Sequence, residues 1–314
     1  MNLEQTQQCM IQGLEEQIFT GAVLVVSHKK QEVFSRPYGK LGDTETPSVT
    51  ERTLFDLASL TKILATTPVW IVLASRRPEI LDQRITEWFP AAPSDKEKIT
   101  PRDLLAHISG LPAWRPYYLS RDDRSMMQLA KNEVLSEPLE YQTGSTSVYS
   151  DLGFILLAAI AELESGQTFY SFCRKQIYEP LGISNDLTFN PVGQEYRTAW
   201  TRQGEPPGLV NDLNARALGG ISGHAGLFGT AQAAIVVANE IVAGREGKSA
   251  LFNQEIKRLS SAPVAEEPIK KRSRPETGNT GIGFLDLPLD PMAHIFSFLD
   301  PQSQGRAAQV CRCV

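Results

Sequence analysis

Apolar and polar positions near the start of the chain predict a helix, a hairpin and a second, longer helix. Apolar residues at positions 10, 14 and 18 share one helical face, so an amphipathic helix is expected within residues 1–19. Two apolar runs, 21–28 and 31–34, flank a Lys-Lys turn and indicate two antiparallel strands. A further apolar run predicts a helix over 59–76.

The middle of the chain, to about residue 185, is predicted to be mostly helical, with breaks at prolines and glycines. Its clearest helix covers 151–163, where Asp151 is the candidate N-cap and Gly166 follows the last turn. Another helix is expected over 231–242. From residue 263 to 278 the chain is charged, contains three prolines and has no periodicity, which is typical of a solvated linker.

Composition and charge exclude several classes of function. The chain has 314 residues and an ordinary share of apolar positions, enough for a sizeable core. Its net charge of −5 argues against nucleic acid as a partner. No Cys/His cluster has the spacing of metal ligands, and no disulfide framework is visible, so neither a metal nor a cofactor is expected. The four cysteines are Cys9, Cys173, Cys311 and Cys313.

No segment predicts a membrane anchor. The longest apolar stretch, 63–75, is too short to span a bilayer and contains Pro68. Residues 1–19 are polar and lack the apolar centre of a signal peptide. A cytoplasmic protein is therefore expected.

The most informative chemical motif is Ser59-Leu-Thr-Lys62, at the predicted start of the helix over 59–76. Positions i and i+3 share one face of a helix, so the Lys62 amine can reach the Ser59 oxygen. A desolvated lysine loses its proton more readily and can accept the proton that a nucleophilic serine must give up. The start of a helix also favours a developing oxyanion. A similar motif, Ser27-His-Lys-Lys30, lies in a strand and turn that cannot provide this geometry.

Three further segments supply candidate partners for Ser59. Tyr149 directly precedes the helix over 151–163, and a phenol beside a lysine can carry a proton to or from the serine. His107 begins a polar turn, where it acts either as a structural hydrogen-bonding residue or as a base. Residues 219–229 are glycine-dense, which fits both a flexible surface loop and a backbone that passes close to a ligand.

Together these segments resemble the β-lactamase and penicillin-binding serine hydrolase family, in its class C and esterase-like branch, over residues 1 to about 260. The motifs occur in the family's order: Phe55-Asp-Leu-Ala-Ser-Leu-Thr-Lys62, Leu104-Leu-Ala-His-Ile-Ser-Gly-Leu-Pro112, Tyr149-Ser-Asp-Leu-Gly153, Pro180-Leu-Gly182 and residues 214–228. The resemblance implies an α+β fold with an antiparallel sheet flanked by helices and a helical subdomain. It also implies an acylated Ser59 with Lys62 and Tyr149 as proton-transfer partners. The substrate-binding candidates are Asp151, His107, His224 and Gly226.

Two departures from the family pattern change the expected activity. The second motif is usually Tyr-x-Asn, but Asp151 stands here, and an ionised carboxylate accepts hydrogen bonds without donating them. The third motif, a basic residue two before a glycine on a strand, has two imperfect candidates. His224-Ala-Gly226 matches a more upstream family segment and leads into a helix-like run, and Asn279-Thr-Gly281 lacks the basic residue. Since that strand supplies the second oxyanion N–H, worth about 10²–10³ in rate, we expect a C-terminally truncated domain with weak or no activity.

The C-terminal residues predict two short helices that resemble an F-box. Asp290-Pro291 is a typical helix start, and the apolar residues after it fall on one helical face. The resemblance lies in Leu287-Pro288, in the run from Ile295 to Pro301, and in Ala-Ala-Gln-Val-Cys-Arg near the end. It implies binding to the adaptor subunit of a cullin-type ubiquitin ligase, and hence a eukaryotic cytosol, which is the host cytosol for an intracellular microbe. The adaptor-binding candidates are Leu287, Pro288, Ile295, Phe296 and Leu299.

The sequence thus predicts three parts: a serine hydrolase domain over 1–262, a linker over 263–284 and an F-box-like segment over 285–314. The leading function is hydrolysis of an amide or ester through an acyl-Ser59 intermediate. The substrate would be a small molecule or peptide, such as a β-lactam, a D-amino-acid peptide or a small ester. The alternative is a non-catalytic adaptor, in which a degenerate hydrolase domain recruits a target for a ubiquitin ligase. Other open interpretations are a C-terminal helix that packs on the hydrolase domain, and a product with neither activity.

Overall fold

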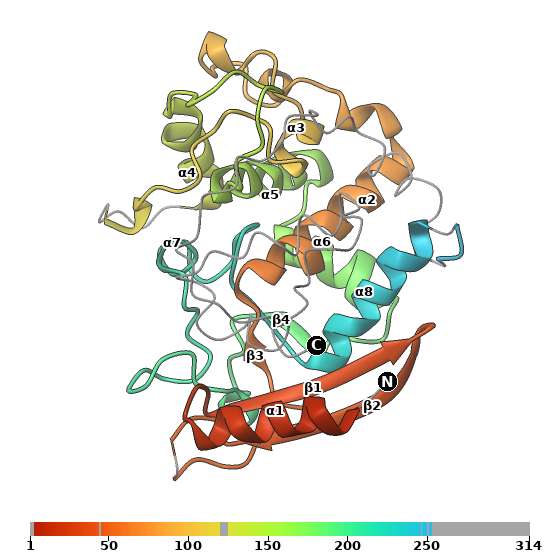
Figure 1. The fold of residues 1–314 in the computed structure, drawn as a ribbon. Coiled ribbons are helices and arrows are strands. Elements are labelled where there is room, and N and C mark those ends of the chain that lie inside the picture. The colour runs from red at the N-terminus through yellow and green to blue at the C-terminus, as the bar shows by residue number, and fades with distance from the viewer. Residues whose placement is uncertain (1–2, 44, 120–124, 246, 250, 253–314) are drawn as a thin grey trace, which may run out of the picture.

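The computed structural model describes residues 3–43, 45–119, 125–245, 247–249 and 251–252 (Figure 1). Its α-helices are α1 (Leu3–Glu15), α2 (Thr67–Arg76), α3 (Pro101–Leu105), α4 (Met126–Asn132), α5 (Asp151–Ser165), α6 (Phe169–Cys173), α7 (Leu213–Ala217) and α8 (Ala231–Arg245). Its strands are β1 (Gly21–His28), β2 (Gln31–Gly39), β3 (Phe55–Asp56), β4 (Leu187–Phe189) and β5 (Leu227–Gly229). Short 3₁₀ turns are Ala58–Leu60, Pro78–Leu81, Ile85–Glu87, Ser94–Lys96, Tyr117–Leu119, Val134–Ser136 and Glu195–Arg197, and π-helical turns are Lys62–Thr66 and Arg174–Tyr178.

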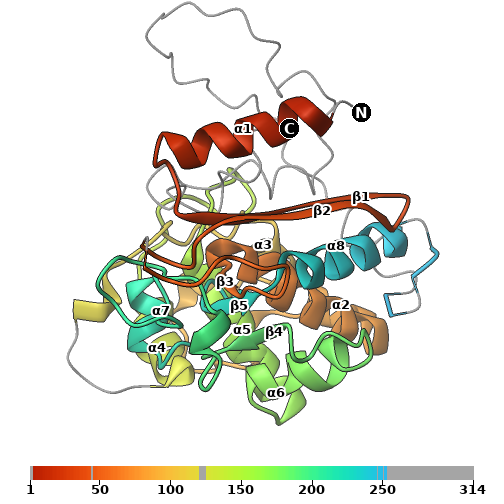
Figure 2. The same cartoon turned by 90° about the horizontal axis from the view of Figure 1, so that it is seen from below.

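The N-terminal hairpin lies between two helices. Strands β1 and β2 pair antiparallel, from Gly21 opposite Gly39 to His28 opposite Gln31, which confirms the predicted hairpin and extends its second strand. Helix α1 covers one face of this sheet and α8 lies on the other (Figure 2). Leu24 packs with Met10 of α1, whereas Val23 packs on the opposite face. Because both faces are covered, β1 is a continuous apolar run.

The main core lies in the helical part of the molecule, around α2 and α5. The predicted helix over 59–76 is present as a 3₁₀ turn, a π-helical turn and then α2. Trp70 is fully buried, and its indole N–H donates to the carbonyl oxygen of Leu157 in α5 at 3.1 Å. The stretch Ala58–Arg76 is long and apolar enough to cross a membrane, but most of it is buried inside the protein, as in a core helix.

Helix α5 begins one residue away from its predicted cap. The N-cap is Ser150, whose hydroxyl accepts a hydrogen bond from the Gly153 N–H, so the expectation that Asp151 caps this helix was wrong. Asp151 is instead the first helical residue, and its side chain is free to reach another partner. At the other end Gly166 has φ +66°, the left-handed conformation that commonly ends helices, as its position in the sequence indicated.

A small second sheet brings the serine motif next to the glycine-dense segment. Its strand order is β3-β5-β4, and both pairs are antiparallel. Phe55 and Asp56 pair with Gly229 and Phe228, so the chain leading to Ser59 runs beside the chain that follows His224. The architecture is therefore the α+β fold expected from the sequence. The linker over 263–284 and the F-box-like segment over 285–314 lie outside the described residues.

Gly223 allows the glycine-dense segment to press against α5. A Cβ at this position would clash with the Phe154 carbonyl oxygen. Gly153, within α5, is a matched control because a Cβ there meets Leu104 only at ordinary van der Waals distance, 3.5 Å.

We expect Gly223→Ala to lower the free energy of unfolding by about 2 kcal/mol, since backbone atoms must separate to admit the methyl group. Gly153→Ala should be neutral or stabilise by up to about 1 kcal/mol, because alanine suits a helix interior. Urea unfolding of both variants measures the difference. Equal stabilities would show that Gly223 has no such packing role.

Candidate active site

Ser59 sits on a turn whose backbone is held by a carboxylate. Ala58, just before it, has φ +46°, a left-handed conformation that is costly for a residue with a side chain. Asp56 stabilises this turn because its Oδ1 accepts from the Ala58 N–H at 2.9 Å. Its Oδ2 accepts from the Asn211 N–H at 2.7 Å, which ties a distant segment to the turn. Burial raises the pKa of Asp56 to about 6, against the lowering effect of these two hydrogen bonds.

Lys62 points at Ser59 from a buried position. Its side chain is 1% exposed, and its Nζ lies 3.2 Å from the Ser59 Oγ. The same Nζ donates to the His224 carbonyl oxygen at 3.1 Å and lies 2.7 Å from the Asp151 Oδ1. It also lies 4.7 Å from the centre of the Tyr149 ring. The structure therefore brings Ser59, Lys62 and Tyr149 together, as the motifs predicted.

The electrostatic setting of Lys62 differs from the one expected from the sequence. Burial on its own lowers the pKa of this lysine, but the charges and hydrogen bonds of Asp151 and Tyr149 outweigh burial, so the pKa is raised. The expectation of a lysine that loses its proton through desolvation was therefore wrong. The raised pKa comes mainly from Asp151, the acidic residue of the Tyr-x-Asp motif: besides its predicted place at the substrate, its carboxylate pairs with Lys62.

His107 lies behind the site and not on its surface. The imidazole is 6% exposed and stacks on Phe154 and Tyr149, with ring centres 5.0 and 4.7 Å away. Its Nδ1 accepts from the Ser150 N–H at 3.0 Å. Burial, with a smaller effect of Lys62, lowers the pKa of His107 to about 3, so the ring is neutral at pH 7. His107 therefore supports Tyr149 and the start of α5 from a buried position, and its predicted contact with substrate stays a prediction.

His224 and Gly226 also support the site through their backbone. The His224 side chain is 1% exposed and turns away to Ser222 and Asp212, so only its carbonyl oxygen contacts a catalytic candidate. Gly226 has φ +105°, and a Cβ there would clash with the Gly220 carbonyl oxygen. The glycine permits two backbone segments to approach. In the structure both residues contribute to the site through their backbone.

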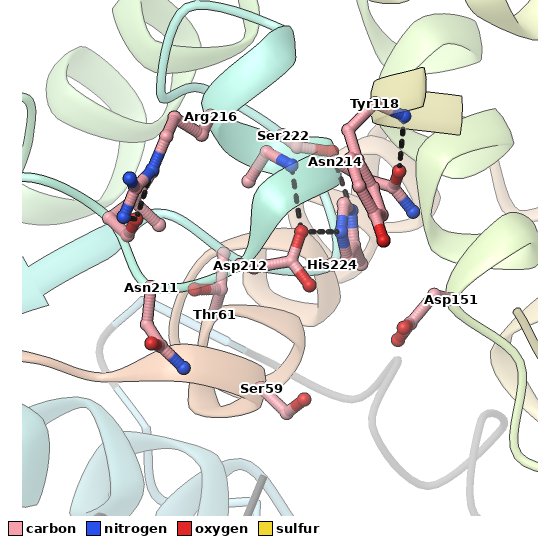
Figure 3. Close-up of polar contacts among 12 residues, drawn as sticks. Ser59, Thr61, Tyr118, Asp151, Asn211, Asp212, Asn214, Arg216, Ser222 and His224 are labelled. Carbon is pink, nitrogen blue, oxygen red and sulfur yellow. Dashed lines mark hydrogen bonds and ion pairs between the residues drawn. The ribbon is translucent and has the colours of Figure 1, made fainter. Parts of the chain in front are cut away.

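The sequence did not identify Asp212 as part of this site. Asp212 caps α7, since its Oδ1 accepts from the Ala215 N–H at 2.7 Å. The sequence offered one indication of this role, an aspartate directly before a short helical run. The close-up shows Ser59 and Asp151 facing a common space, with Asp212 and His224 beside it (Figure 3). One ligand atom from each of Asp151, Asp212 and His224 lies within 4.8 Å of the others, a spacing that suits a metal ion. The two carboxylates of this cluster need a positive charge nearby. We assign that role to the Lys62 ammonium, which already pairs with Asp151, and not to a metal ion.

The remaining candidates, Leu287, Pro288, Ile295, Phe296 and Leu299, lie outside the described residues, as does Asn279-Thr-Gly281. Within the described part of the chain, the site offers a serine hydroxyl in hydrogen-bond reach of a lysine at the start of a helix. That arrangement can form and break an acyl–serine bond.

Comparison with known proteins matches this arrangement to characterised folds. A solved penicillin-binding protein homologue from Pyrococcus abyssi superposes with a TM-score of 0.66 at 18% identity, covering 83% of this chain and 60% of that one. A class C β-lactamase from Rhodobacter sphaeroides gives a TM-score of 0.64 at 20% identity, covering 82% and 69%. These likenesses show the fold.

One curated relative is the N-acetylmuramyl-L-alanine amidase of Bacillus subtilis (strain 168), 31% identical over 294 residues. The match covers 80% of this chain and 65% of the relative, so the chain spans slightly less than two thirds of that protein's length. An F-box-like family model matches residues 284–313. The Beta-lactamase family model matches residues 6–284, well over half of the sequence. The chain belongs to the β-lactamase family.

Proposed function

We propose that this protein hydrolyses an amide or ester bond through an acyl-Ser59 intermediate. The observation that carries the proposal is the buried Lys62 Nζ, 3.2 Å from the Ser59 Oγ and fixed by Asp151 and the His224 carbonyl. Membership of the β-lactamase family and the likeness to an amidase support the same chemistry.

In the proposed reaction the Ser59 Oγ attacks the carbonyl carbon while its proton passes to the neutral form of Lys62. The proton then goes to the leaving amine or alcohol as the carbonyl–heteroatom bond breaks, which leaves an ester on Ser59. Water then attacks the ester carbonyl and gives a proton to Lys62. That proton passes to the Ser59 Oγ as the acyl–oxygen bond breaks, which releases the acid and restores the serine. The N-terminal end of the Ala58–Arg76 helical stretch stabilises the oxyanion in both steps.

The raised pKa of Lys62 determines how this reaction depends on pH. Below that pKa most molecules carry the ammonium form, which cannot accept the serine proton. Acylation should therefore speed up as pH rises toward the pKa of Lys62. The Tyr149 hydroxyl interacts with the same amine and offers a second place for the proton.

A second function rests on the F-box-like match over residues 284–313. In this proposal the C-terminal segment binds the adaptor subunit of a ubiquitin ligase and the hydrolase domain recruits a target. Such a protein would act in the cytosol of a eukaryotic cell. The two functions are compatible because Ser59 and the segment lie in different parts of the sequence.

The first test is covalent labelling of the purified chain with a fluorescent penicillin and a fluorophosphonate. We expect labelling by at least one probe, and a loss of roughly a thousandfold or more in Ser59→Ala, since the acyl acceptor is removed. Ser27→Ala is the matched control, because Ser27 precedes Lys30 by the same spacing but lies in β1. Equal labelling of Ser59→Ala and the unmodified chain would disprove the role of Ser59.

A second prediction concerns substrate charge. Lys62 is 1% exposed and Asp151 is 17% exposed, so a substrate meets a carboxylate and not an ammonium at this point. Among three p-nitroanilides, those of D-alanine, N-acetyl-D-alanine and N-succinyl-D-alanine, the cationic substrate should have the highest kcat/KM and the anionic one the lowest. The two ends should differ by roughly tenfold, as for a partly screened charge pair.

In Asp151→Asn the kcat/KM of the cationic substrate should come close to that of the anionic one, whatever the change does to the absolute rates. Asp82→Asn is the control, because it removes an equal charge at an exposed position paired with Arg102. A preference for the anionic substrate would count against a carboxylate at the substrate contact.

The adaptor proposal is tested by a pull-down of the full chain with the purified ligase adaptor subunit. Binding should fall by at least tenfold when Ile295 and Phe296 are both changed to Ala, because large apolar anchors dominate such interfaces. Ser59→Ala should bind as the unmodified chain does. Undetectable binding by the unmodified chain would remove the adaptor function.

A further inference from the structure

Beside Lys62 lies a pair of side chains, Asp212 and His224, that the proposed reaction has not used. The His224 imidazole is bound at both ring nitrogens: the Ser222 Oγ lies 2.7 Å from Nδ1, and the Asp212 Oδ1 lies 2.9 Å from Nε2. An ionised carboxylate can only accept, so Nε2 carries a hydrogen toward Asp212, while the Ser222 hydroxyl forms the hydrogen bond at Nδ1. The ring is thus fixed in one orientation.

Fixing this ring also fixes the backbone of the same residue. The His224 carbonyl oxygen accepts from the Lys62 Nζ at 3.1 Å, and the lysine side chain is 1% exposed, so water does not solvate this amine. Two hydrogen bonds on the imidazole therefore hold one of the oxygens that solvate the buried ammonium.

Asp212 is itself held in place by the segment that anchors the nucleophile. Its Oδ1 also accepts from the Ala215 N–H at 2.7 Å, and the preceding residue, Asn211, donates its backbone N–H to Asp56. Asp56 in turn holds the turn before Ser59. The neighbouring residues Asn211 and Asp212 (Figure 3) thus connect the carboxylate that holds the Ser59 turn with the imidazole whose backbone holds Lys62.

Asp212 also contributes charge. A carboxylate oxygen of Asp212 and one of Asp151 lie within 4.8 Å of each other, so two acidic groups share the neighbourhood of one ammonium. Burial alone would raise the pKa of Asp212, but His224 and Lys62 outweigh it and hold that pKa well below the ordinary value. Asp212 is therefore ionised at neutral pH.

We infer that Asp212 and His224 are positioning residues for acylation: His224 fixes the carbonyl oxygen that holds the Lys62 amine, and Asp212 orients His224 and supplies a second negative charge to Lys62. The inference rests on the proposed acyl-Ser59 chemistry. Asp151 pairs with the lysine amine directly, and the Asp212–His224 pair holds the carbonyl oxygen that also binds this amine. Asp151 and Tyr149 raise the pKa of Lys62, and Lys62 in turn lowers the pKa of His107 and that of Asp212. The His224 side chain faces Asp212, and only the His224 backbone carbonyl contacts the amine.

The test compares Asp212→Asn with Asp82→Asn, which removes an equal charge far from the site. The first readout is the titration of Lys62, followed through the ¹³Cε resonance of the full, lysine-labelled chain and assigned with Lys62→Met. The second is the rate of p-nitrophenyl acetate acylation against pH. Removing the Asp212 charge should move the Lys62 midpoint and the acidic limb of the rate profile to lower pH, and Asp82→Asn should move neither.

Ser222→Ala separates orientation from charge. It removes the hydrogen bond to Nδ1 without altering any charge, so it should lower the acylation rate about tenfold or more while moving the Lys62 midpoint less than Asp212→Asn does. An unchanged Lys62 midpoint in Asp212→Asn, or an unchanged rate in Ser222→Ala, would overturn the inference. If Ser59 is never acylated, the proposed function fails, but the lysine titration still decides whether Asp212 acts on Lys62.

Discussion

A buried ammonium group is the constraint on which this structure depends. An ion removed from water loses several kcal/mol of solvation, which only close oxygen partners and an aromatic face can replace. Lys62 obtains them from Ser59, Asp151, Tyr149 and the carbonyl of His224, which lie far apart in the sequence. The fold must therefore bring three segments to one point, and much of the helical core exists around that point.

Several features of the backbone bring these three segments together at Lys62. Ser150 caps α5 so that Asp151 begins the helix facing Lys62, and the buried His107 supports the residues just before it. Gly223 lets the third segment lie directly on α5, and the Thr66 hydroxyl donates to its carbonyl oxygen at 2.6 Å. A π-helical turn over Lys62–Thr66 begins at the lysine itself, a form of helix that often occurs at functional sites.

Local patterns predicted much of this arrangement. Periodicity identified the hairpin, the helix over 59–76 and α5, and the Ser-x-x-Lys spacing placed Ser59 and Lys62 on one helical face. Prediction failed where a residue's role depends on a partner distant in sequence. Nothing near Asp151 indicates that its charge meets Lys62, and nothing near His224 indicates that its ring turns inward to Asp212. The cap of α5 was missed because Ser150 and Asp151 are both good capping residues, and only the geometry decides between them.

The contact between Lys62 and the His224 carbonyl joins residues 162 positions apart, and this has a consequence for synthesis. At a translation rate of about 5–20 residues per second, the ribosome needs roughly 8–30 s to make the chain between them. During that interval the lysine has been made but one of its oxygen partners has not. Until the later segment leaves the ribosomal exit tunnel, water or a chaperone must solvate this amine. The core around Lys62 can therefore close only after His224 has emerged from the ribosome.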